Sequence, residues 1–128
     1  MEREYFVSAG VGEPPEPYCQ VVRAGSIVFI AGQVAMDENW QVVGLGDPLA
    51  QAEQVWKNLD RAAAAAGGSA ADIVKITVFL SDIRHAPAEM EVRARYFDRG
   101  RRPVCTQVQA ASLGLPELLM EVDAIAIV

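Results

Sequence analysis

Two acidic residues near the end of the chain, Glu121 and Asp123, are spaced so that their carboxylates can act together. They alternate within an apolar stretch, and alternate residues of a β-strand point to the same side. A partly buried carboxylate with polar neighbours can move protons or orient water. The same spacing also fits a solvated strand face or ion pairs at a subunit contact, because one polar face is ordinary in a strand. The spacing alone favours this structural interpretation.

A second set of polar residues alternates shortly before these acids. Cys105, Gln107 and Gln109 would share one face of a strand, and if this strand pairs with the last one, several polar groups converge. A reactive cysteine needs a nearby cation or helix N-terminus, whereas a neighbouring carboxylate such as Glu121 disfavours the thiolate. The only histidine, His85, is not spaced to pair with Cys105. We therefore interpret Cys105 as a packed or cleft-lining thiol.

Composition argues against several classes of function. The chain has two cysteines and one histidine, without metal-binding spacing, so we expect no metal site and a reducing compartment. The net charge of −6 disfavours nucleic acid as a partner. No apolar run reaches the roughly 20 residues that span a bilayer, and no signal peptide follows the charged N-terminus. We expect a cytoplasmic protein with no membrane partner.

Cations are concentrated in one short segment, which contains Arg93, Arg95, Arg99, Arg101 and Arg102. The pattern is typical of a solvated helix face and loop, with pairing to Glu89 and Glu91. The alternative is that Arg93 or Arg102 supplies a cation to a binding site.

The spacing of apolar residues predicts the strands and helices that position these side chains. Strands are predicted over residues 3–8, 18–23, 27–31, 73–80, 104–111 and 118–128, with a short extra strand near 40–43. In the fourth strand, one predicted face contains Val74, Ile76, Val78 and Leu80.

The first helix is predicted to begin at Asp47-Pro48 and to end at Gly67-Gly68, with apolar residues from Leu49 to Ala66 on its buried stripe. The second should run from Pro87 to about Asp98, with a stripe made of Met90, Ala94 and Phe97. The order β-β-β-α-β-α-β-β predicts one α+β domain over residues 1–128. Both helices should cover one face of a mixed sheet, because each must bury its stripe.

Two motifs resemble the Rid family of reactive-intermediate deaminases, also called the YjgF family. Residues 18–33 read YCQVVRAGSIVFIAGQ, and residues 121–126 read EVDAIA. Family members carry Pro-Tyr-Ser-Gln-Ala-Val, then Ser-Gly-Gln, and end in Glu-hydrophobic-Glu-Ala-Ile-Ala. The resemblance implies a chorismate-mutase-like α+β fold and a homotrimer with ligand clefts between subunits. Strands that are apolar on both faces are consistent with burial by assembly.

The resemblance also implies roles for single residues. Glu121 matches the acid that positions the hydrolytic water in deaminating members, with Asp123 secondary. Tyr18 matches the cleft tyrosine, and Gly32 matches the glycine whose backbone lines the cleft. The substrate would be a small molecule, and no cofactor is expected, because an imine is already electrophilic and water is the nucleophile.

One motif departs from the family. Residues 103–107 read PVCTQ, where deaminating members carry Pro-Ala-Arg-Ser-Cys or close variants. Cys105 therefore stands at the arginine that binds the substrate carboxylate, and Gln107 stands where many members have Cys or Thr. A thiol is one weak donor in place of a guanidinium fork. Losing such a contact costs about 1.5–3 kcal/mol, which predicts roughly ten- to hundred-fold weaker binding of an imino acid. Met90 and Arg93 also replace common Asn and Tyr residues, so we expect a reshaped cleft to which Arg93 contributes.

The predicted function is hydrolytic deamination of a reactive imine or enamine, or a related acid/base step, on a substrate other than ordinary 2-imino acids. The alternatives are a non-catalytic binding or chaperone-like trimer, a specialised biosynthetic enzyme and an endoribonuclease. The acidic balance and the absence of a histidine pair argue against the last.

Overall fold

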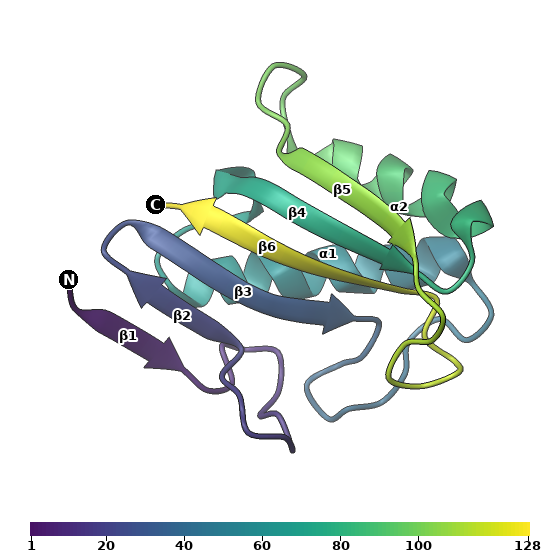
Figure 1. The fold of residues 1–128 in the computed structure, drawn as a ribbon, viewed down its shortest axis with the longest axis horizontal. Coiled ribbons are helices and arrows are strands. Elements are labelled where there is room, and N and C mark those ends of the chain that lie inside the picture. The colour runs from purple at the N-terminus through teal and green to yellow at the C-terminus, as the bar shows by residue number, and fades with distance from the viewer.

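Six strands form one mixed sheet in the order β1-β2-β3-β6-β4-β5, and the computed structural model describes all 128 residues (Figure 1). The strands are β1 (Arg3–Phe6), β2 (Val21–Ala24), β3 (Ile27–Val34), β4 (Ile73–Leu80), β5 (Val104–Gln109) and β6 (Met120–Ile127). All neighbours are antiparallel except β4 and β5, which are parallel. Helices α1 (Pro48–Ala65) and α2 (Ala86–Arg93) cover one face of the sheet, which confirms the expected α+β architecture (Figure 1). Short 3-10 turns occupy Ala70–Asp72, Ile83–His85 and Ala94–Tyr96.

Helix α1 begins and ends where its sequence predicts. The side chain of Asp47 accepts a hydrogen bond from the Ala50 amide at 3.1 Å, which satisfies one free N–H of the first turn. Pro48 occupies the first turn, where its missing N–H leaves no bond unmade. Gly67, with φ of +93°, follows the last turn in a conformation that other residues rarely adopt.

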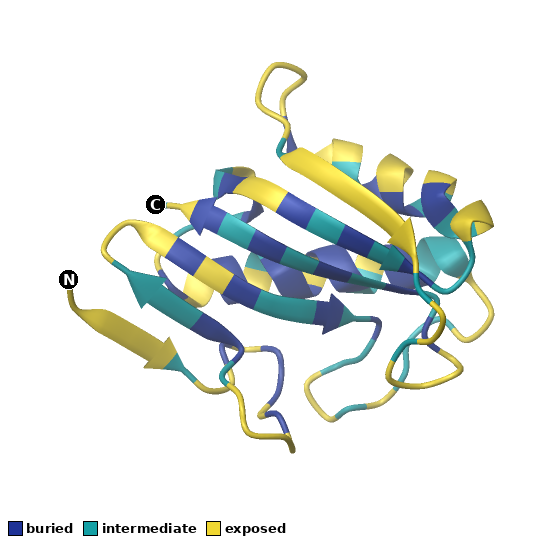
Figure 2. Cartoon of the chain, in the orientation of Figure 1, coloured by how far each residue is buried: buried dark blue, intermediate teal, exposed yellow.

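The core lies between the helices and the sheet. Alternate residues of β4 and β6, among them Ile76, Val78 and Val122, are buried against Trp56 and Leu59 of α1. Figure 2 shows this alternation as dark bands along both strands. The predicted stripe of α1 is confirmed, because its apolar residues belong to this core or pack against it.

Two details of the predicted strands are wrong. Val74 is exposed, because the pairing of β4 with β6 shifts register between Ile73 and Lys75 and turns Val74 away from the core. The extra strand near 40–43 is only an isolated bridge between Met36 and Val42.

The second helix is shorter than predicted and rotated about its axis. Helix α2 ends at Arg93, and a 3-10 turn continues to Tyr96. Phe97 is buried as expected, but Met90 and Ala94 are exposed, and Glu89 is buried instead. A paired glutamate therefore stands on the side of α2 that faces the core.

The face of the sheet away from the helices is uncovered in the single chain, and so is the edge strand β5. All six residues of β5 are exposed, and the strand appears yellow throughout in Figure 2. On the open face, apolar side chains such as Ile27, Phe29 and Ile127 are also exposed. No helix has both the length and the apolar character needed to cross a membrane.

Candidate functional site

Glu121 of β6 lies directly over Gly32 of β3. The pairing of these strands shifts register between Ile30 and Gln33, so Gly32 falls at an irregularity of the ladder. A Cβ added to Gly32 would stand 2.6 Å from Oε2 of Glu121. Only glycine leaves room for the carboxylate at this position.

The carboxylate of Glu121 is half-buried and accepts no hydrogen bond from any other group of the chain. Burial, and then the charge of Asp123, raise the pKa of Glu121 above its ordinary value of 4.5. Asp123 itself accepts a hydrogen bond from the Thr77 amide at 3.2 Å. The lone pairs of Glu121 are thus available to a water molecule or a ligand, and its basicity is increased.

Tyr18 lines the same cavity as Gly32 and Glu121. Burial raises the pKa of the Tyr18 hydroxyl, and the charges of Glu16 and Glu121 raise it further. The phenol therefore keeps its proton and can donate a hydrogen bond.

The cavity that these residues share has a volume of about 530 Å³. It lies among the loop before β2, the loop after β3 and the loop before β6. Its apolar lining includes Val11, Val34, Met36, Trp40, Leu115 and Leu118. A cavity of this size, lined by apolar side chains together with polar ones, is suited to a small molecule.

Two buried glutamines hold the wall that carries Tyr18. Gln33 donates from Nε2 to Oε1 of Gln20 at 2.9 Å, and Gln20 donates from Nε2 to the Gly12 carbonyl at 3.1 Å. The indole N–H of Trp40 donates to the Glu13 carbonyl at 2.9 Å. The proline-rich loop is therefore tied to both β3 and the loop that follows it.

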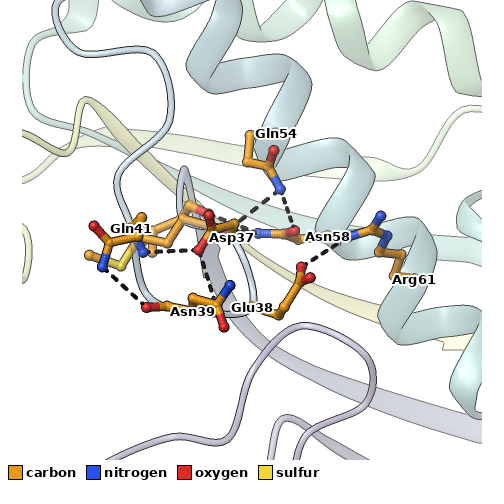
Figure 3. A network of polar contacts seen from close by, with 9 residues as sticks. Asp37, Glu38, Asn39, Gln41, Gln54, Asn58 and Arg61 are labelled. Atoms are coloured by element: carbon orange, nitrogen blue, oxygen red, sulfur yellow. Dashed lines mark hydrogen bonds and ion pairs between the residues drawn. The ribbon is translucent and has the colours of Figure 1, made fainter.

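Asn58 of α1 fixes another part of the cavity lining. Its Nδ2 donates to the carbonyls of Val34 and Met36 at 3.0 and 2.9 Å, and its Oδ1 accepts from Nε2 of Gln54 (Figure 3). The carboxylate of Asp37 accepts from backbone amides of the same loop (Figure 3). Sequence reasoning missed Asn58, although a polar residue beside the apolar stripe of α1 was a usable signal.

The other predicted site residues, Cys105, Gln107 and Arg93, do not line this cavity in the single chain. The last two strands do not pair, because β4 lies between β5 and β6, so the condition for their polar groups to converge is not met within one chain. Cys105 and Gln107 are in register with Ile76 and Val78, whose side chains face the helices. Within one chain, these polar groups do not converge on Glu121.

Arg93 of α2 is held by a buried acid. Its Nε donates to Oε2 of Glu89 at 3.0 Å and its Nη2 donates to Oε1, while the indole N–H of Trp56 donates to Oε2 at 2.9 Å. The pKa of Arg93 is raised above its ordinary value. Burial acts to lower this pKa, but the hydrogen bond and the charge of Glu89 outweigh the effect of burial, and the neighbouring Cys105 raises the pKa further. The guanidinium of Arg93 thus lies beside the thiol of Cys105.

The fold and the arrangement of Tyr18, Gly32 and Glu121 agree with one protein family, and the whole-chain comparisons give the same result. A family model described as "Endoribonuclease L-PSP" matches residues 12–128. The chain belongs to this family, which is the Rid or YjgF family that its motifs resemble.

Among its relatives, a 3-aminoacrylate deaminase RutC from Acinetobacter baylyi is 35% identical, with 98% of each chain covered. A RutC-family protein from Pyrococcus horikoshii is 34% identical, with 97% of each chain covered. Of the solved structures, RidA from an Antarctic Psychrobacter has a TM-score of 0.88 at 29% identity, over 98% of this chain and 99% of its own. The Escherichia coli protein TdcF with bound serine has a TM-score of 0.86 at 30% identity, over 98% of each.

Proposed function

We propose that this protein hydrolyses a reactive imine or enamine to a carbonyl compound and ammonia. The observation that carries the proposal is the carboxylate of Glu121, which has no protein partner and stands in a cavity beside Tyr18. The deaminase among the relatives supports the reaction class. The raised pKa of Glu121 suits a group that takes a proton from water.

In the proposed reaction, Glu121 orients a water molecule and removes its proton as the water oxygen attacks the imine carbon. The bond that forms is C–O, and the C=N electron pair moves to nitrogen, which is protonated. The C–N bond of the tetrahedral intermediate then breaks, and the hydroxyl proton passes to the departing nitrogen, so that the carbonyl compound and ammonia form. Tyr18 donates a hydrogen bond within the cavity. Water is the only co-reactant.

We propose further that the active unit is a trimer, as the family resemblance implies. The exposed apolar side chains on the open sheet face support burial by other copies. The unpaired edge of β5 supports the same assembly. It would bring Cys105, Gln107 and Arg93 of one copy toward Glu121 of another. Because Cys105 cannot bind a carboxylate bidentately, ordinary 2-imino acids are expected to be poor substrates.

Ammonia release tests the proposed function. Imines are generated in the assay from common amino acids and from simple amines, and wild type is compared with Glu121→Gln. The variant keeps the size of the side chain but removes the base, so we expect a rate loss of about 10²–10⁴-fold. Glu91→Gln, on the exposed side of α2, is the matched control. Unchanged turnover in Glu121→Gln, with circular dichroism confirming the fold, would place the chemistry elsewhere.

A second candidate is a non-catalytic trimer that binds small molecules, which the cysteine at position 105 favours. Saturable ligand binding without turnover of any imine would support it. Endoribonuclease activity has less support, because the chain carries a net charge of −6 and no Lys, Arg or His lines the cavity around Glu121.

A further inference from the structure

The charges around the candidate cavity all have one sign. Glu16 and Glu121 are its only charged lining residues, and no Lys, Arg or His lines it. Both carboxylates act on Tyr18, whose hydroxyl they make harder to ionise. Arg93, which the proposed trimer would bring toward Glu121 of another copy, is already neutralised by Glu89 of its own chain. A ligand that carries a carboxylate would meet repulsion here, and a cationic ligand would be attracted.

The rest of the lining suits an apolar group. Trp40 forms one wall, and Met36, Leu115 and Leu118 contribute further apolar surface. A bulky apolar group packs well against such a wall, because the rigid indole offers a large apolar surface and the flexible methionine side chain adapts to the shape of a ligand.

The backbone of Trp40 is held in an unusual conformation. Its φ is +60°, a region that a bulky residue seldom adopts, and the indole is fixed by the Glu13 carbonyl. The facing loop approaches so closely at Gly12 that a Cβ there would stand 3.4 Å from the indole. Strain of this kind, kept at a cavity wall, is a sign of function.

From these observations we propose that the cavity takes a protonated imine without a carboxylate, whose cationic nitrogen lies toward Glu121 and Glu16 and whose apolar group packs against Trp40. The inference rests on the proposed function and names its substrate class. The reaction stays balanced: the iminium and one water give the carbonyl compound and ammonium. Protonation of the imine makes its carbon more electrophilic, and the two carboxylates stabilise the charge.

Stable ligands with one shared skeleton test the charge preference. 2-Phenylethylamine, 2-phenylethanol and phenylacetate present a cation, a neutral group and an anion next to the same ring. Calorimetric titration of the wild-type protein at pH 7 should show the amine binding at least about tenfold more tightly than phenylacetate, with the alcohol between them. Equal or tighter binding of phenylacetate would overturn the inference, as would the absence of amine binding.

Two kinds of variant separate charge from packing. Glu121→Gln and Glu16→Gln should each weaken the amine several-fold and leave the alcohol unchanged. Trp40→Ala should weaken all three ligands together. Glu91→Gln, outside the cavity, should change none of them. An amine preference that survives in the double variant Glu16→Gln, Glu121→Gln would overturn the assignment of these carboxylates.

The outcomes distinguish this inference from the function on which it rests. Preferential amine binding without turnover of any imine would contradict the deaminase proposal and leave the charge preference standing. Efficient turnover of 2-imino acids, with no preference for the amine, would confirm a deaminase and overturn the substrate class.

Discussion

Glu121 fills the space that any side chain at position 32 would need: a Cβ on Gly32 would lie 2.6 Å from Oε2 of Glu121 and 2.8 Å from its carboxyl carbon. The atoms in the way are the far end of a flexible side chain and not backbone. A substitution at Gly32 therefore displaces the proposed catalytic group before it disturbs the fold.

Gly32→Ala is accordingly expected to reduce turnover by about 10²-fold, because small displacements of a catalytic group have effects of that order. The variant should remain folded. Ammonia release and thermal unfolding, measured together, check both statements. Gly100→Ala is the control, because an added Cβ there meets no atom within 4 Å. Full activity in Gly32→Ala would show that the position of the Glu121 carboxylate is unimportant.

The pH dependence of the rate should report the environment of Glu121. Burial and the charge of Asp123 raise the pKa of Glu121 above 4.5. The active, deprotonated form therefore appears only as the pH rises through this raised pKa, and kcat/KM should increase with pH along this acid limb of the profile. Asp123→Asn removes the second cause and should move the limb to lower pH. The asparagine oxygen can still accept from the Thr77 amide. An acid limb that stays in place in Asp123→Asn would assign it to another group.

Cys105→Arg should restore binding of carboxylate-bearing substrates. A guanidinium at this position offers two parallel donors, which a thiol lacks. The expected result is a roughly ten- to hundred-fold gain in kcat/KM on 2-imino acids, with a loss on protonated imines that lack a carboxylate, because the added cation repels them. Thr106→Arg, one residue along β5 and on its other face, is the control. High wild-type turnover of 2-imino acids, unaffected by Cys105→Arg, would point to Arg93 as the cation.

Assembly should depend on the open face of the sheet. The wild-type chain is expected to sediment as a trimer, and Phe29→Glu should shift it toward monomer, because Phe29 is 46% exposed in the single chain and lies among apolar neighbours. Leu45→Glu, at an exposed loop position before α1, should leave the trimer intact. A wild-type monomer at micromolar concentration would remove the basis for a site between subunits.

The residues found from the sequence are those whose roles follow from local pattern. Asp47-Pro48 identifies the start of α1 because capping is a local interaction, and the alternation of β4 and β6 identifies the core side of both strands. Tyr18, Gly32 and Glu121 belong to two short motifs, and the structure places all three on one cavity.

The features that sequence analysis missed depend on partners distant in the chain. Glu89 occupies a core position of α2 only because Trp56 and Arg93 satisfy its carboxylate. Asn58 matters because two loop carbonyls reach it. The position of β4 between β5 and β6 is a choice among strand orders, and alternation within a strand carries no information about that order.

At Trp40, the residue that would best stabilise the left-handed backbone differs from the residue that would best select the proposed ligand. Glycine or asparagine would adopt a φ of +60° with less strain, yet either would remove the indole from the cavity wall. Engineering for heat resistance alone would therefore favour a small residue at position 40, and the resulting protein would have a wider, less discriminating cavity.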